Sequence, residues 1–130
     1  MTVLVDSWGW IEYFNGSAPG KKVRELIENS REKVIVSAIN IAEVYNSFLR
    51  DFPYPDNERL AEASREAMRQ RSYIFEVDEN IAVESARLKH KMKWGIGDSI
   101  VYATAKREGA KLMTGDPHFK DVKNVVYLGK

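Results

Sequence analysis

The segment Thr2-Val3-Leu4-Val5-Asp6-Ser7 decides what kind of fold the chain can form. Its uninterrupted apolar run predicts a strand buried on both faces, which is typical of a parallel sheet covered by helices. The run ends on Asp6, and the carboxyl ends of parallel strands form the edge where open α/β sheets bind their ligands. A cap on the next helix explains a single Asp here equally well. Other acids must reach the same edge before a site is indicated.

Strands and helices alternate along the rest of the sequence. Short apolar, often β-branched runs predict further strands at residues 33–37, 73–77, 111–114 and 125–128. Helix-spaced apolar residues predict helices at residues 8–15, 23–27, 41–50, 58–71, 78–92 and 98–108. This order predicts an α/β fold of three α/β/α layers around a central, mainly parallel sheet of four to five strands. The inner faces are expected at Leu60, Ser64, Ala67 and Met68 in the 58–71 helix, and at Ile81, Ala82, Ser85, Leu88 and Met92 in the 78–92 helix.

Length and composition favour one domain over residues 1–130, with no repeat or linker to divide it. The net charge is only +1, from 20 basic and 19 acidic residues, so any affinity for nucleic acid must come from local patches. The absence of cysteine excludes disulfides and thiolate metal sites. Asp6 interrupts the first apolar run too early for a signal peptide, and no run approaches the roughly 20 apolar residues of a membrane span. We therefore expect a soluble protein of the cytoplasm.

Three further acids are predicted to lie beside Asp6. In a parallel sheet with right-handed crossovers, every strand brings its carboxyl end to the same edge. Asp116 follows the 111–114 strand, and Asp98 begins the helix that leads into that strand. Glu43 lies one turn into the helix after the 33–37 strand. The topology therefore brings four carboxylates towards one edge of the sheet.

Four clustered carboxylates raise one another's pKa values and lower stability unless a cation binds among them. Mg²⁺ and Mn²⁺ prefer oxygen ligands, and one or two such ions can activate water and stabilise phosphate displacement. Each acid also has a purely structural explanation. Asp6 and Asp98 are placed to cap helices, and Asp116 lies in a common turn sequence. Glu43 occupies a helix position that is usually exposed, but the convergence of all four favours a site.

Four motifs give the chain a resemblance to a known family: Val3-Leu4-Val5-Asp6-Ser7, Asn40-Ile41-Ala42-Glu43-Val44, Gly97-Asp98-Ser99-Ile100-Val101-Tyr102-Ala103-Thr104-Ala105 and Leu112-Met113-Thr114-Gly115-Asp116-Pro117-His118-Phe119. In this order and spacing they resemble the PIN-domain family and, within it, the VapC-type toxin ribonucleases. The resemblance covers essentially the whole chain. It implies a PIN-like fold and a Mg²⁺- or Mn²⁺-dependent endoribonuclease, the toxin of a type II toxin–antitoxin pair.

The resemblance also implies roles for individual residues. It implies a catalytic cluster of Asp6, Glu43, Asp98 and Asp116, of which Asp6, Asp98 and Asp116 bind the metal. Thr114 matches a hydroxyl residue that orients Asp6 by a hydrogen bond, and Ser7 is a supporting residue beside Asp6. The implied partners are the RNA substrate, a second copy of the chain in a homodimer, and a small antitoxin whose tail covers the acidic edge.

Basic and aromatic residues near these acids are candidates for RNA contacts, and each has a structural alternative. Lys89, Lys91 and Lys93 can hold phosphates beside the site, or they form a solvated helix end. Trp8 and Trp94 can stack on bases, although core or interface positions are favoured for both.

Other functions are alternatives to a toxin nuclease. An aspartyl-phosphate enzyme needs a second acid two residues after Asp6, where this chain has Trp8. A dinucleotide enzyme needs a glycine-rich phosphate loop after the first strand, which is absent from the sequence. A non-toxin RNA-processing nuclease of the PIN-domain family fits the same residues, whereas the intact acids disfavour an interaction module without catalysis. His118 is interpreted as a bystander, and Asp121 either is an extra outer-sphere acid or, as favoured, lies in an exposed loop.

Overall fold

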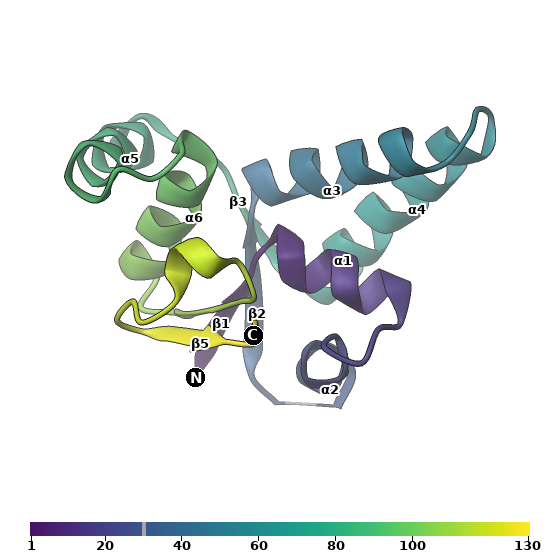
Figure 1. The fold of residues 1–130 in the computed structure, drawn as a ribbon, viewed down its shortest axis with the longest axis horizontal. Coiled ribbons are helices and arrows are strands. Elements are labelled where there is room, and N and C mark those ends of the chain that lie inside the picture. The colour runs from purple at the N-terminus through teal and green to yellow at the C-terminus, as the bar shows by residue number, and fades with distance from the viewer. Residues whose placement is uncertain (30) are drawn as a thin grey trace.

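The computed structural model describes residues 1–29 and 31–130 and is built on a five-stranded sheet (Figure 1). The strands are β1 (Thr2–Val5), β2 (Lys33–Ser37), β3 (Tyr73–Phe75), β4 (Lys111–Thr114) and β5 (Val125–Tyr127). They lie in the order β3-β2-β1-β4-β5, and every neighbouring pair is parallel. β1 is therefore the central strand, and all the carboxyl ends reach one edge of the sheet. The predicted mainly parallel sheet is confirmed.

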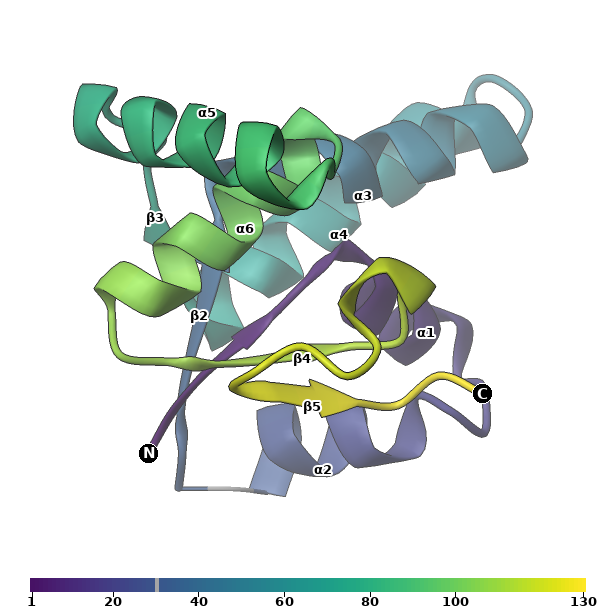
Figure 2. The ribbon, with the colours of Figure 1, turned by 60° about the vertical axis from the view of Figure 1, so that its left-hand side comes forward.

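Helices cover both faces of the sheet. They are α1 (Ser7–Asn15), α2 (Lys21–Asn29), α3 (Ala38–Asp51), α4 (Asp56–Arg71), α5 (Glu79–Met92) and α6 (Ile96–Arg107), with a short 3₁₀ helix, η1 (Pro117–Phe119). α1 to α4 lie on one side and α5 and α6 on the other, and α3 and α4 form a hairpin that extends away from the sheet (Figure 1). Figure 2 shows α6 between α5 and the strands. No described helix is long and apolar enough to cross a membrane.

Side chains of β1 alternate between two hydrophobic cores. Val3 and Val5 pack on the side of α1 to α4, in a cluster that includes Trp10. Leu4 packs on the opposite side, in a cluster that includes Val101 of α6. All five side chains are at most 3% exposed. This two-sided burial is what the apolar run predicts, and it fixes the end of β1 at the centre of the molecule.

Most element boundaries differ from the prediction by one to three residues. α4 begins at Asp56 rather than at residue 58, and β3 ends at Phe75 rather than at residue 77. α6 begins at Ile96, so Gly97 lies inside the helix and Asp98 lies in its first turn rather than at its cap. Glycine was expected to end the preceding helix, but a first turn tolerates it because backbone N–H groups there have no partner within the helix. Asp98 is therefore the third residue of α6 and not its first.

Two helices bury the predicted face, but that face is narrower than expected, and serines lie at its centre. Ser64 in α4 donates its hydroxyl to Ala61 O, and Ser85 in α5 donates to Ile81 O, each at 2.6 Å. A serine satisfied in this way can be buried, and its small side chain lets the neighbouring helix come close. Ser64, Met68, Ile81 and Ser85 are buried as predicted, but other residues predicted for these faces are not. Leu60 and Ala67 are in fact half-buried, and Ala82 and Met92 are exposed.

Candidate functional site

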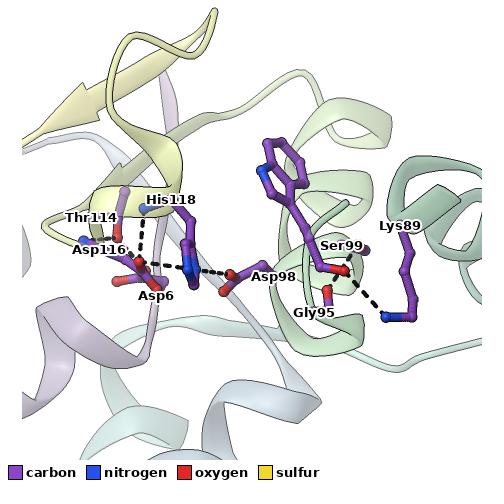
Figure 3. Close-up of polar contacts among 9 residues, drawn as sticks. Asp6, Lys89, Gly95, Asp98, Ser99, Thr114, Asp116 and His118 are labelled. Atoms are coloured by element: carbon purple, nitrogen blue, oxygen red, sulfur yellow. Dashed lines mark hydrogen bonds and ion pairs between the residues drawn. The ribbon is translucent and has the colours of Figure 1, made fainter. Parts of the chain in front are cut away.

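The four predicted acids come from separate elements that meet at the carboxyl edge of the sheet. Asp6 follows β1 and Asp116 lies just after β4, and these two strands pair directly in parallel. Asp98 lies in the first turn of α6, and Glu43 lies in α3. Figure 3 shows Asp6, Asp98 and Asp116 gathered in the same space around His118. The fold thus brings together acids that are far apart in the sequence.

Asp6 is the most deeply buried of these acids, with 6% exposure. Its Oδ1 accepts a hydrogen bond from Gly9 N at 3.0 Å and caps α1, and its Oδ2 accepts one from Thr114 Oγ1 at 2.5 Å. Burial raises the pKa of Asp6 to about 7, against the effect of these two hydrogen bonds. The negative charges of Asp116 and Glu43 contribute a smaller part of this rise in pKa. Asp6 therefore does cap α1. A cation bound nearby would lower the pKa of Asp6 and favour its ionised form.

Thr114 is fully buried and connects two of the acids. Its hydroxyl donates to Asp6 Oδ2 and accepts a hydrogen bond from Asp116 N at 3.0 Å. Because the Asp116 N–H occupies a lone pair of the hydroxyl, the Thr114 proton is directed at Asp6. The hydrogen bond that the resemblance implied for Thr114 is therefore present.

His118 lies between two of the acids (Figure 3). Its Nδ1 is 2.8 Å from Asp98 Oδ2 and 3.3 Å from Asp116 Oδ1. The hydrogen bond to Asp98 and the charges of both acids raise the pKa of His118. Burial raises the pKa of Asp98, against the hydrogen bond from His118. Donor atoms of Asp98, Asp116 and His118 all lie within 4.8 Å of one another, close enough for one cation to contact all three.

The sequence did not predict this contact of His118 with two of the acids. Asp116 Oδ1 accepts a hydrogen bond from His118 N at 3.0 Å and caps η1, with Pro117 at the start of that turn. The turn folds the imidazole back towards the acids. The signal was the sequence Asp116-Pro117-His118, because an Asp that caps its own turn brings the residue two positions later close to its carboxylate.

Glu43 is exposed and is held at the site by side chains from two other positions. Ser7 Oγ donates to Glu43 Oε1 at 2.5 Å, and Asn40 Nδ2 donates to Ser7 Oγ at 3.0 Å. Glu43 Oε2 has no hydrogen bond within the described residues. A Cβ atom placed on Gly97 would lie 3.3 Å from this oxygen, so Oε2 faces the start of α6 next to Asp98.

Asn40 received no role from the sequence, yet it is fully buried at the centre of this network. Its Oδ1 accepts a hydrogen bond from Ser37 N at 3.0 Å and forms a capping box with Ser37 at the start of α3. Its Nδ2 points the other way, to Ser7. The spacing of Ser37 and Asn40 was a usable signal, because the third residue of a helix commonly bonds back to its cap.

The predicted RNA contacts are only partly available. Lys89 Nζ donates to Trp94 O at 3.3 Å, which ties it to the end of α5 (Figure 3). Lys91 and Lys93 are exposed. Trp94 is 8% exposed and packs edge-on against two aromatic rings, so it belongs to the core and does not stack on a base.

A parallel sheet with acids at its carboxyl edge is the arrangement expected from the resemblance to the PIN-domain family. The family model of the PIN domain matches residues 3–125, and the chain belongs to that family. Among curated proteins, none matches this sequence.

Solved structures similar to this chain include several toxin–antitoxin proteins. A toxin–antitoxin complex from Klebsiella pneumoniae is 22% identical with a TM-score of 0.77, and the match covers 98% of both chains. VapC20 from Mycobacterium tuberculosis, a sarcin–ricin loop cleaving toxin, is 16% identical with a TM-score of 0.77 over 93% of this chain and 95% of that one. VapBC2 from Rickettsia felis, bound to a fragment of promoter DNA, is 16% identical with a TM-score of 0.73 over 98% and 97%. These likenesses confirm the expected fold.

Proposed function

We propose that this protein is an endoribonuclease that uses Mg²⁺ or Mn²⁺ at the carboxyl edge of its sheet. The observation that carries the proposal is the cluster of Asp98, Asp116 and His118, whose donor atoms lie within 4.8 Å of one another. The charges of Asp116 and Glu43 also act on the buried carboxyl of Asp6. Carboxylate oxygens are the ligands that Mg²⁺ and Mn²⁺ prefer. The donor set therefore fits such an ion.

Each residue has a distinct task in this proposal. A bound ion of this type polarises a phosphodiester and lowers the pKa of a water molecule. Asp98 and Asp116 would hold the ion, with Asp6 as a third carboxylate oriented by Thr114. Glu43 would accept a proton from the attacking water at Oε2, which has no hydrogen bond within the described residues. In-line hydrolysis then leaves 5′-phosphate and 3′-hydroxyl ends.

We further propose that the protein is the toxin of a toxin–antitoxin pair in the cytoplasm. Support comes from membership in the PIN domain family and from structural neighbours that are toxin–antitoxin complexes. The partner would be a small antitoxin whose tail covers the acidic edge, and the toxin would form a homodimer. Co-purification with the product of the adjacent reading frame tests the pairing. A protein that is harmless when expressed alone would favour an RNA-processing nuclease without a toxin role.

The nuclease activity is tested by incubating the purified protein with total cellular RNA, in Mn²⁺ and separately in EDTA. We expect cleavage in Mn²⁺ alone, with 3′-hydroxyl ends on the products. A thermal-shift titration with Mn²⁺ distinguishes an interaction module from an enzyme, because a ligand that binds only the folded state stabilises it. No cleavage together with no shift at millimolar Mn²⁺ would contradict the proposal.

A further inference from the structure

Trp8 differs from the other two tryptophans of the chain. Trp10 is fully buried and Trp94 is 8% exposed, and both pack against other aromatic rings. Trp8 is half-buried, belongs to neither of the large core clusters, and contacts no aromatic ring within the described residues. A large apolar side chain is thus left partly open to water in the first turn of α1, two residues after Asp6.

The indole of Trp8 is nevertheless held in a fixed place. A Cβ atom on Gly115 would lie 2.3 Å from both Cε2 and Cζ2 of Trp8, so the ring lies directly on the Gly115 backbone. No other residue type leaves room for this contact. Gly115 stands between Thr114 and Asp116, and the contact therefore fixes the ring beside the acidic edge.

The polar atom of the ring also faces water. Trp8 Nε1 has no hydrogen bond within residues 1–29 and 31–130. The buried polar atoms without a hydrogen-bond partner in that part of the chain include Trp10 Nε1 but not Trp8 Nε1. The N–H edge of Trp8 is thus accessible to solvent, unlike that of Trp10.

We propose that Trp8 stacks on a base of single-stranded RNA next to the bond that is cut. This inference rests on the proposed nuclease function and adds a specificity-determining residue to it. Single-stranded RNA is commonly recognised by stacking of splayed bases on aromatic rings. The ring lies on the backbone that carries Asp116, so a nucleotide whose phosphate enters the acidic site brings an adjacent base to it. Trp8 therefore sets how the RNA lies relative to Glu43 and Asp98.

The test measures binding of two fluorescently labelled probes, a 12-nucleotide oligoadenylate and an abasic ribose-phosphate oligomer of the same length, by anisotropy in EDTA, where no cleavage is expected. The proteins compared are the parent, Trp8→Ala and Trp8→Phe. The matched control is Tyr54→Ala, because Tyr54 is 81% exposed between α3 and α4, away from the acids. Circular dichroism and the melting temperature show that each variant is folded.

We expect Trp8→Ala to bind oligoadenylate roughly tenfold more weakly than the parent, as for the loss of one base–aromatic stack. Trp8→Phe and Tyr54→Ala should stay within about threefold of the parent, because a phenyl ring also stacks on a base. All four proteins should bind the abasic oligomer alike. Since Trp8 is the one tryptophan that is more than 8% exposed, oligoadenylate should also quench the parent's tryptophan fluorescence.

Equal binding of oligoadenylate by the parent and Trp8→Ala would overturn the inference, and so would an equal loss on the abasic oligomer. If the parent cleaves total RNA and Trp8→Ala binds like it, only the role of Trp8 is wrong. If the parent neither binds nor cleaves RNA, the nuclease function fails first. Loss of homodimer or antitoxin binding in Trp8→Ala with unchanged RNA binding would instead assign Trp8 to a protein interface.

Discussion

The two halves of the acidic site differ in burial and in what holds their carboxylates. Asp6 is 6% exposed and is held by a backbone N–H and by the buried hydroxyl of Thr114. Asp98 is more open, and its partner is the imidazole of His118, whose side chain is 65% exposed. The first half is fixed by the ends of β1 and β4, whereas the second depends on a short turn and on an exposed imidazole.

This difference in burial indicates different roles for the two halves of the site. The buried half is ordered before any ligand arrives, and it carries a cost because burial raises the pKa of Asp6 to about 7. In the exposed half, the imidazole of His118 contacts the two carboxylates that a cation would bind. We therefore expect changes in the exposed half to act mainly on metal binding, and changes in the buried half to act on stability as well.

The largest effect is expected for Asp98→Asn and Asp116→Asn. Because a bound cation contributes several kcal/mol of transition-state stabilisation, the rate of RNA cleavage should fall at least about 1,000-fold in either variant. The measurement is single-turnover cleavage in Mn²⁺. Asp121→Asn is the matched control, since Asp121 is exposed with a φ of 64°, which Asn also adopts. If Asp116→Asn cleaved RNA as fast as Asp121→Asn, the carboxylate of Asp116 would not be needed for cleavage.

Asp6→Asn should stabilise the metal-free protein. The folded-state pKa of Asp6 is about 7 and the unfolded value is 3.8, so the folded state binds more protons between these values. Stability therefore falls as pH rises through that window, and Asn avoids this loss. The gain in EDTA at pH 8 should be on the order of 2 kcal/mol, below the roughly 4 kcal/mol that three pKa units allow.

The stability of Asp6→Asn is measured by urea unfolding at pH 4.5 and pH 8, with Asp121→Asn as the control. We expect the gain to shrink at the lower pH, where Asp6 is protonated in the folded protein. A gain that does not depend on pH would mean that burial does not keep this carboxyl neutral.

Thr114→Val should lower the cleavage rate about tenfold, in the range of losses of residues that orient metal ligands. Valine keeps the shape of threonine but removes the hydroxyl that donates to Asp6 and accepts from Asp116 N. Thr114→Ser keeps the hydroxyl and should stay within about threefold of the parent. Equal rates for the Val and Ser variants would show that Asp6 needs no orienting bond.

The smallest effect is expected at Asn40, which acts on Glu43 mainly through Ser7 and directly only by a long hydrogen bond of 3.5 Å to Oε1. Asn40→Asp keeps an oxygen that accepts the hydrogen bond from Ser37 N, but it loses the N–H that donates to Ser7 Oγ. Asn40→Ala loses both hydrogen bonds. Both variants should lower kcat about fivefold with little change in KM, which is less than the roughly 10- to 100-fold loss for residues that hold a metal ligand directly. Asn40→Ala should also lose about 1 kcal/mol of stability from the missing cap, and Asn40→Asp should lose stability because it buries a carboxylate beside Glu43.

The sequence carried enough information for the sheet and for the four acids, but not for the contacts between them. The apolar run before Asp6 predicts a central strand, and parallel topology then places Asp116 beside it. The contact of His118 with Asp98 depends on how one short turn folds, which no periodicity encodes. The role of Asn40 depends on a side-chain rotamer at a helix start. His118 contacts Asp98 and Asp116 from a short 3₁₀ turn. Asn40 contacts Ser7, the neighbour of Asp6, from the start of α3.

The most direct test of the central claim is a crystal structure of the protein soaked in Mn²⁺, with the ion located by anomalous scattering. We expect a peak that contacts carboxylate oxygens of both Asp98 and Asp116 at about 2.2 Å, the range of Mn–oxygen and similar hard-cation bonds. We also expect His118 to have turned away from Asp98. A structure at millimolar Mn²⁺ with no peak at the carboxyl edge of the sheet, and with His118 still between the two acids, would rule out a metal site at Asp98 and Asp116.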